Sequence, residues 1–500
     1  MADKARGKGG LTRRDLLKGT FLLGGGLLVG TESLAQVIRG KPKANELAYL
    51  KLTARPMSFP ILPGEATQTW SYEGTYLSGI AAPRAGYLGP ILRVIRDAYL
   101  NVDFTNLLPE DTTVHWHGLD VPAIMDGHPI MAVPPGGKFN FAFRILNRAG
   151  TYWFHPHPHM RTAFQVAKGM AGVLIVEDPA EAGLNLPTGN RDRVYVIQDR
   201  SFDSQNQWAY SPGGAGGFLG TQVLVNGRVD LLEEVGTAVY RLRFLNGSNT
   251  RIYKLAWSNG MPMTVIASDQ GLLAAPRSLP YVMLSPGERV EIWADFRNIP
   301  LGQVVSLQSQ EFNPGWTGGS ATLPQGYYCH MMDYRVTQVL QDTRTLPSIL
   351  SKIETYRLED ATNKNNPRII PLSRVGAQWL LNGATYGLHD ILPNEIVPRG
   401  ELQVWEFRND IGMNIMAHPM HLHGSPFQIL DRTTLPGFEQ YYDTVKVGLI
   451  EEGWKDTFLI MPGQRVRILT KFANFTGRFL YHCHNLEHED MGMMRNLDIV

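Results

Sequence analysis

Alternating apolar and polar residues recur along the chain and predict strands rather than helices. Residues 89–106 and 400–409 read as two such runs, and two others follow the Pro-Gly pairs at 135–136 and 462–463. Successive side chains of a strand point to opposite faces, so these runs fit sheets that are buried on one side. Glycine (51 residues) and proline (32 residues) are plentiful, and helical periodicity is scarce. The pattern indicates an all-β chain with many turns.

The four runs belong to one repeated plan. The first leads to His-Trp-His-Gly at 115–118, and its counterpart leads to His-Pro-Met-His-Leu-His-Gly at 418–424. The runs after the Pro-Gly pairs lead to Trp-Phe-His-Pro-His at 153–157 and to Tyr-His-Cys-His at 481–484. The two ends of the chain therefore repeat each other, histidines included.

The middle of the chain keeps this frame without the histidines. It has a strand-like run at 239–246, and Gln-Val-Leu-Val-Asn-Gly at 222–227 echoes Gln-Trp-Leu-Leu-Asn-Gly at 378–383. The glycine-rich stretches 211–220 and 313–320 are expected to be surface loops.

Repetition on this scale indicates duplicated β-sandwich domains. We expect domains over residues 45–180, 190–337 and 350–500, with boundaries near 178–192 and in the polar stretch 359–367.

The N-terminus has the features of an export signal, which we place at residues 1–35. Thr-Arg-Arg-Asp-Leu-Leu-Lys at 12–18 is a twin-arginine pattern, followed by an apolar run at 19–30 and a small-x-small cleavage site before Gln36. The apolar run is too short and glycine-rich to span a membrane, although an uncleaved N-terminal anchor is an alternative. We expect the twin-arginine translocase to export the protein to the periplasm or another extracytoplasmic space of a prokaryote.

Charge and cysteine content exclude some functions. The chain has 47 basic and 46 acidic residues, so nothing in its charge favours a nucleic-acid partner. Its two cysteines are Cys329 and Cys483. Because Cys483 lies in a metal-binding pattern, a disulfide is not expected, and Cys329 reads as a small buried hydrophobic residue. We expect a monomer.

The last twenty residues carry the sharpest chemical pattern. Cys483 is followed by His488 five residues later and by Met493 ten residues later. A blue-copper site takes two histidines and a cysteine, with a weak axial methionine. If residues 479–484 form a strand, Cys483 lies on one face and His482 and His484 lie on the other. One strand would then serve two metal sites joined by a single peptide bond.

Histidines supply the rest of this pattern. Ten of the fourteen fall into four clusters, at 115/117, 155/157, 418/421/423 and 482/484/488. A single His-x-His pair is as compatible with a satisfied core or surface histidine as with a ligand. Four clusters at repeat-matched positions favour a compact multinuclear metal site.

With these four motifs present, the chain resembles the three-domain multicopper oxidases of the laccase-like superfamily. It is most similar to the prokaryotic branch of copper-efflux oxidases and bacterial laccases, over nearly everything after the signal. The resemblance implies three cupredoxin-like Greek-key β-sandwich domains and four copper ions. It also implies four one-electron oxidations of a reducing substrate, coupled to reduction of O2 to water. The middle domain would be a spacer, and the three-copper cluster would lie between the first and third domains.

The resemblance also assigns ligands, position by position. These are His418, Cys483, His488 and Met493 for type 1 copper; His115 and His421 for type 2; and His117, His155, His157, His423, His482 and His484 for the type 3 pair.

Two carboxylates match the acids that deliver protons in this family. Asp126 follows His115 by eleven residues, and Glu489 is next to His488. Asp126 could instead be a turn residue before a glycine, and Glu489 could be an acid that only orients a ligand. Asp490 is expected to orient a ligand at most, and His159 to lie outside the ligand set.

The electron donor is the least determined feature. Met413 and Met416 precede His418 and could line the substrate edge, or they could be packing. Copper-oxidising members often have an acid where this chain has Asn414, and the long Met-rich insertion of copper-efflux members is absent. We therefore expect phenols or aromatic amines as donors, with Cu(I) or Fe(II) as the alternative.

Three alternatives to this function are open. A copper nitrite reductase would leave the eight cluster histidines unused. An exported, non-catalytic scaffold of this fold would have no need to keep every ligand. An electron acceptor other than O2 is not excluded by the residues.

Overall fold

The structure is a computed structural model that describes residues 47–78, 86–212, 214–317, 322–410 and 416–500. The export signal and the substrate-edge residues Met413 and Asn414 lie outside these described residues.

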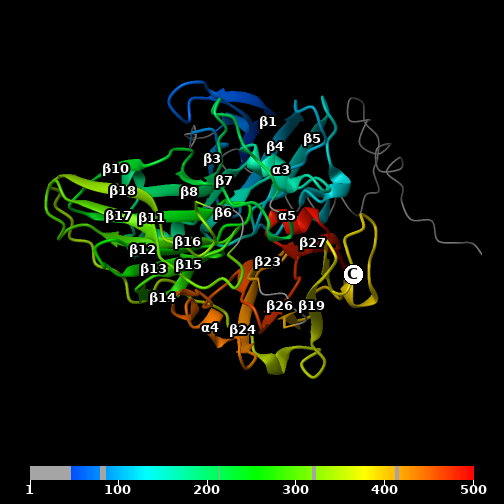
Figure 1. Ribbon diagram of the computed structural model, residues 1–500. Coiled ribbons are helices and arrows are strands. Elements are labelled where there is room, and N and C mark those ends of the chain that lie inside the picture. The colour runs from blue at the N-terminus through cyan, green and yellow to red at the C-terminus, as the bar shows by residue number, and fades with distance from the viewer. Residues whose placement is uncertain (1–46, 79–85, 213, 318–321, 411–415) are drawn as a thin grey trace, which may run out of the picture. The chain divides into compact units, whose positions relative to one another are not determined.

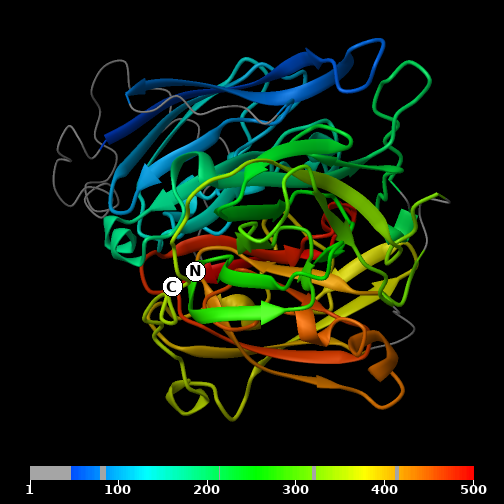
Figure 2. The ribbon, with the colours of Figure 1, turned by 90° about the vertical axis from the view of Figure 1, so that its left-hand side faces the viewer.

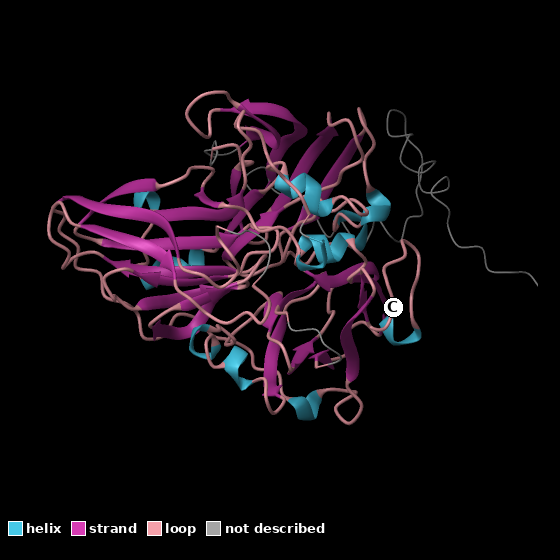
Figure 3. Ribbon diagram, viewed as in Figure 1, coloured by secondary structure: helices cyan, strands magenta, loops and turns pink. Residues whose placement is uncertain are grey.

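Strands dominate the described chain, and its helices are short (Figure 3). The α-helices are α3 (Thr162–Ala167), α4 (Glu439–Tyr442) and α5 (Leu486–Asp490). Short 3-10 helices occur at Ala123–Met125, Pro129–Met131, Pro179–Leu184, Gly189–Arg191, Gly214–Gly216, Leu358–Asp360, Pro393–Glu395 and Lys446–Gly448. None of the described helices has the length and apolarity needed to cross a membrane. The all-β prediction is confirmed.

The first group of strands forms a four-stranded sheet, β2-β1-β4-β5, and a three-stranded sheet, β3-β7-β6 (Figures 1 and 2). Their bounds are β1 Leu47–Phe59, β2 Thr67–Ser78, β3 Ile91–Ile95, β4 Tyr99–Asn106, β5 Lys138–Arg144, β6 Gly150–Phe154 and β7 Gly172–Glu177. The two sheets share one core, in which Val102 and Phe104 of β4 pack with Tyr152 and Leu174.

The run at 89–106 is two strands rather than one. A turn at Asp97, whose φ is 68°, separates β3 from β4. Strand β3 pairs with β7, whereas β4 pairs with β1 and β5, so the two halves belong to different sheets. The turn lets one apolar stretch contribute to both walls of the sandwich.

The middle group forms a five-stranded sheet, β10-β18-β17-β12-β15, and a six-stranded sheet, β14-β13-β16-β11-β8-β9. Their bounds are β8 Asp192–Arg200, β9 Gln222–Val225, β10 Leu231–Gly236, β11 Val239–Asn246, β12 Tyr253–Trp257, β13 Met263–Ser268, β14 Gly271–Leu279, β15 Val282–Leu284, β16 Arg289–Asp295, β17 Val304–Ser309 and β18 Cys329–Gln338. Both sheets bury their apolar side chains in a common core that includes Cys329. Cys329 is therefore a buried free thiol, as predicted.

The third group forms two five-stranded sheets, β20-β19-β22-β26-β24 and β21-β28-β27-β23-β25. Their bounds are β19 Arg368–Val375, β20 Gln378–Leu381, β21 Ile396–Val397, β22 Gln403–Asn409, β23 His418–Leu422, β24 Phe427–Thr434, β25 Thr457–Ile460, β26 Gln464–Thr470, β27 Gly477–Cys483 and β28 Met494–Ile499. Apolar residues of both sheets again share a core. The structure thus contains three sandwiches, and the exact domain boundaries stay predictions.

The sequence echo at 222–227 and 378–383 is one tight turn used twice, each closed by an isolated bridge, Val225 to Arg228 and Leu381 to Ala384. Asn226 and Gly227 have φ of 50° and 72°, and Asn382 and Gly383 have φ of 55° and 78°. Positive φ at both central residues is the requirement of a tight type I′ turn, which Asn-Gly meets at little cost.

The stretch 211–220 is a surface loop only in its first half. Residues 211, 212 and 214 are exposed, but residues 216–220 are buried. The Phe218 N–H donates to Glu487 Oε2 (3.1 Å), so this half packs against α5. The surface-loop prediction was wrong there because a buried carboxylate binds the loop backbone.

Candidate metal centre

Strands β23 and β27 form the centre of the site. They pair antiparallel, with Met420 opposite Cys483 and His421 opposite His482. Because alternate side chains point to opposite faces, each strand carries ligand-type residues on both sides. All ten clustered histidines, Cys483 and Met493 are at most 2 % exposed.

The first metal group is His418, Cys483 and His488, whose ligand atoms lie close enough to hold one ion. Cys483 Sγ lies 3.5 Å from His418 Nδ1 and 3.7 Å from His488 Nδ1. Helix α5 places His488 next to the Cys483 sulfur. The Asn485 side chain caps that helix by accepting a hydrogen bond from the His488 N–H. Met493 is buried just after α5, and its carbonyl accepts from the Cys483 N–H (3.0 Å).

Burial keeps the protein groups of this site neutral when no cation is bound. It raises the pKa of the Cys483 thiol well above its usual value and lowers the pKa of His418 to about 3. A thiolate forms here only if a bound cation replaces the proton. A cysteine with two imidazoles and a nearby methionine is the donor set of a blue-copper site, so these residues fit copper.

The second group consists of eight histidines from four segments. An isolated antiparallel bridge joins His115 to His155, and β23 and β27 bring in the remaining partners. Most rings of the group lie within 6 Å of several others; for example, the centroids of His115 and His423 are 3.8 Å apart. Candidate metal-holding sets are His115/His117/His155, His115/His421/His423, His157/His423/His482 and His117/His421/Asp456.

Backbone carbonyls determine which ring nitrogen faces inward on several of these histidines. A carbonyl only accepts, so Nδ1 carries the proton in His115 (to Asp126 O, 2.7 Å), His421 (to Asp456 O, 2.7 Å) and His155 (to Pro156 O, 2.9 Å). The Nε2 atoms of His115 and His421 then point their lone pairs at each other across 3.4 Å. Two lone pairs repel unless a cation lies between them.

The same geometry recurs around His482. Its Nδ1 faces Glu489 Oε2 (3.0 Å), and His423 Nδ1 faces Asp126 Oδ2 (2.7 Å). Their Nε2 atoms are 3.1 Å apart, and His157 Nε2 lies 3.4 Å from His482 Nε2. A metal bound about 2 Å from each nitrogen would hold them roughly 3.3 Å apart at a tetrahedral angle. Three inward lone pairs at this spacing fit one metal ion.

Buried nitrogens without hydrogen bonds complete the argument for metal. Among the described residues, His117 Nδ1, His155 Nε2 and both ring nitrogens of His484 have no hydrogen-bond partner. A buried polar atom without a partner costs about 1–3 kcal/mol, so several together need an explanation. Metal coordination supplies it.

The two predicted carboxylates lie behind ligand-type histidines. Asp126 contacts His423, as above, and burial raises the pKa of its carboxyl. Glu489 joins two rings, since its Oε1 lies 3.5 Å from His157 Nδ1. Asp490 caps α3 instead, accepting from the N–H groups of Thr162 and Ala163, so it holds α3 against α5 (Figure 1).

The other predicted residues have different positions. Met416 is half-buried against the core of the third sandwich. His159 is exposed, and its ring centroid lies 5.3 Å from that of Tyr386. It therefore lies outside the ligand set, as expected.

Sequence reasoning missed three contributors. Trp379 of β20 packs against His488, with ring centroids 4.2 Å apart and the rings tilted by 33°. Asp456 and Arg289 lie behind His117, and Arg289 comes from the middle sandwich. No described residue of the middle sandwich belongs to either metal group, as expected of a spacer, but Arg289 of that sandwich binds Asp456 behind His117, so the middle sandwich also supports the cluster. No local motif marks these residues.

Comparisons with known proteins agree with this site. Two family models, each described as Multicopper oxidase, match residues 65–181 and 360–500, together slightly more than half of the chain. These two stretches contain every residue of both metal groups.

Individual relatives are similar over most of their length. The multicopper oxidase mco of Staphylococcus aureus is 31 % identical over 443 residues, covering 88 % of this chain and 88 % of that protein. A crystal structure of a laccase from Pediococcus acidilactici is 34 % identical with a TM-score of 0.77, covering 93 % of this chain and 91 % of that chain. The cell division protein FtsP of Escherichia coli K12 is 29 % identical, covering 92 % of this chain and 90 % of that protein. The predicted fold class, three cupredoxin-like β-sandwiches, is confirmed.

Proposed function

The chain belongs to the multicopper oxidase family, and from this premise we propose which residues hold copper and which substrate is oxidised. The protein is a laccase-like oxidoreductase that uses O2 and a reducing substrate. We assign four copper ions: type 1 to His418, Cys483, His488 and Met493; type 2 to His115 and His421; and the type 3 pair to His117, His155, His157, His423, His482 and His484.

The observation that carries this proposal is that both groups converge on one short segment of chain. Cys483 belongs to the first group, and its neighbours His482 and His484 belong to the second. When bound, copper supplies the one-electron oxidation of the substrate at the first group and the four-electron reduction of O2 to water at the second. The chain supplies a covalent path between the two groups, since one peptide bond joins Cys483 to His482 and another joins it to His484.

Protons are the chain's other contribution. O2 reduction to two waters consumes four protons, and Asp126 and Glu489 are two of the carboxylates in contact with the cluster histidines. We assign them as proton-carrying residues. Glu489 would carry its proton next to His482 Nδ1 and His157 Nδ1. Asp126 would carry its proton next to His423 Nδ1.

For the electron donor we propose phenols and aromatic amines. The similarity to a laccase of Pediococcus acidilactici supports this choice. Met416, with Met413 and Asn414 before it, would form the substrate edge next to His418. Oxidation of Cu(I) or Fe(II) is the alternative, for which thioethers beside the site would be suitable ligands.

We further propose export by the twin-arginine translocase, because residues 12–18 have its pattern, and action outside the cytoplasm as a monomer. The relative FtsP suggests a second candidate, a cell-division role on the same fold. The complete set of ligand-type residues favours the enzyme.

Oxygen uptake by the copper-loaded protein tests the proposal. A phenol such as dimethoxyphenol and Cu(I) would be supplied in parallel, with Cys483→Ser as the control. Turnover of the phenol without added copper supports a laccase, and a much faster reaction with Cu(I) supports the metal-ion alternative. No oxygen uptake with either donor by fully loaded protein would contradict the proposed reaction.

A further inference from the structure

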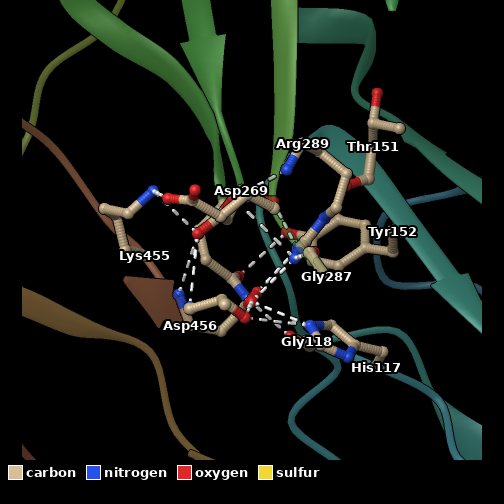
Figure 4. Close-up of polar contacts among 12 residues, drawn as sticks. His117, Gly118, Thr151, Tyr152, Asp269, Gly287, Arg289, Lys455 and Asp456 are labelled. Carbon is tan, nitrogen blue, oxygen red and sulfur yellow. Dashed lines mark hydrogen bonds and ion pairs between the residues drawn. The ribbon is translucent and has the colours of Figure 1, made fainter. Parts of the chain in front are cut away.

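A buried cluster of charges lies beside His117 of the histidine group (Figure 4). It consists of Arg289, Asp269, Asp456, Lys455 and Glu288, each at most 6 % exposed. Lys455 Nζ bridges Asp269 Oδ2 and Glu288 Oε1, at 3.0 Å each. Buried charges of this kind are costly unless every one is paired, so the arrangement needs a reason beyond stability.

Arg289 contacts all three sandwiches. Its Nε donates to Thr151 O of β6 (2.9 Å), and its Nη atoms donate to Gly287 O (3.0 Å) and Asp269 O (2.8 Å) in the middle sandwich. The same two Nη atoms donate to the two carboxylate oxygens of Asp456, just before β25, at 2.7 and 2.6 Å. All five N–H donors of the guanidinium are therefore used. Burial opposes its charge, but Asp456 and Asp269 more than offset this and raise the pKa of Arg289.

Asp456 connects Arg289 to the histidines. Besides Arg289, its carboxylate accepts from Gln270 Nε2 (2.6 Å) and Thr457 Oγ1 (3.0 Å), and it faces His117 Nε2 at 3.1 Å. Its backbone carbonyl accepts from His421 Nδ1 (2.7 Å). One residue thus holds a histidine of the first sandwich with its side chain and a histidine of the third with its backbone.

These contacts determine the tautomer of His117. A carboxylate surrounded by donors can only accept, so His117 Nε2 carries the proton and the lone pair is on Nδ1. His117 Nδ1 is one of the buried nitrogens without a hydrogen bond. It also follows that His117, His421 and Asp456 do not form a metal site of their own, because the Asp456 oxygens are already occupied.

The turn that precedes Arg289 also packs against the His117 ring. Gly287 has a φ of 86°, and a Cβ there would lie 3.0 Å from His117 Cε1 and 3.1 Å from His484 Cδ2. The backbone of the middle sandwich therefore packs directly on two cluster histidines.

We propose that Arg289 is a positioning residue of the copper cluster: through Asp456 it holds His117 with Nδ1 directed at the metal, so that the middle sandwich completes the cluster. The inference rests on the proposed copper assignment. Arg289 touches no ligand itself and acts only through Asp456.

The test is Arg289→Lys, which keeps the charge but cannot make the two-pronged contact with Asp456. We expect it to keep the blue type 1 absorption while it loses cluster copper to a chelator roughly tenfold or more readily than the wild type. Asp456→Asn, which removes the carboxylate and keeps its shape, should give the same selective loss. The turnover number should fall with cluster copper while KM for the donor is unchanged.

The matched control is Arg243→Lys. Arg243 lies on β11 beside β16, is equally buried, and pairs with Asp192 (2.6 Å) and Glu291 (2.5 Å) rather than with the cluster. It should lose neither kind of copper preferentially. If Arg289→Lys keeps its cluster copper, or loses both kinds together as a merely destabilised protein would, the inference is wrong. Wild-type protein that binds no copper would instead overturn the proposed function.

Discussion

The substitution Asp126→Asn distinguishes two roles for Asp126: a carboxylate that carries protons, or a residue that only forms a turn. The backbone of Asp126 is ordinary right-handed helical (φ −73°, ψ −13°), and asparagine adopts it as readily as aspartate. The substitution therefore leaves the turn intact and removes the charge and the exchangeable proton. It also changes the hydrogen bond to His423 Nδ1, whose length is 2.7 Å.

The expected loss of copper retention follows from the hydrogen bond between Asp126 and His423. A buried hydrogen bond to a charged group contributes about 1.5–3 kcal/mol and a neutral one about 0.5–1.5 kcal/mol, so the loss is about 1–1.5 kcal/mol. That corresponds to roughly tenfold weaker retention of cluster copper, within the range expected for a group that orients a metal ligand. If Asp126 also carries protons, turnover should fall further, by about 10²-fold or more, because general acid–base catalysis is lost.

Two assays separate these contributions. Copper retention against a chelator reports the orienting role, and oxygen uptake per fully loaded molecule reports the proton role. Unchanged turnover in fully loaded Asp126→Asn would refute the proton role. If copper retention were unchanged as well, Asp126 would be a turn residue and nothing more.

Three other substitutions test neighbouring parts of the account. Glu489→Gln puts a neutral amide, which cannot carry an exchangeable acid proton, beside His482 and His157, so oxygen uptake should fall roughly 10–100-fold with type 1 absorption unchanged; equal turnover would contradict this. Burial lowers the pKa of His128 to about 4, so its contribution to stability is present above the ordinary value of 6.5 and is lost as pH falls toward 4. Copper-free His128→Gln should therefore lose less unfolding free energy between pH 7 and pH 5 than the wild type in urea titrations, and an equal loss would contradict the reasoning. Gly287→Ala should weaken cluster copper retention, because the new Cβ meets His117 and an alanine is strained at φ 86°; unchanged retention would show that the turn can shift.

Local motifs made the grouping of these residues predictable. Strand alternation suffices to put the adjacent residues Cys483 and His482 on opposite faces of β27, and the structure has them there. The repeat also indicated His115 and His155, although these lie on an isolated bridge rather than in the strands that His-x-His spacing suggested. The bridge brings them together equally well.

Long-range partners could not be predicted in the same way. Asp456 and Arg289 are 167 residues apart, and neither lies in a pattern that distinguishes it from other charged residues. Their role comes from where the middle sandwich packs against the cluster, which depends on the whole tertiary structure. The split of residues 89–106 at Asp97 was missed for a different reason, since one residue at positive φ changes the sheet without breaking the apolar pattern.

Copper content per chain, measured in the loaded wild type and in Cys483→Ser, tests the central claim most directly. The account predicts four ions in the wild type and three in the variant, since the serine removes the type 1 ligand and leaves the eight cluster histidines in place. Equal copper content in the two proteins, or loss of every ion in a variant that is still folded, would contradict two separate metal groups on the opposite faces of β27.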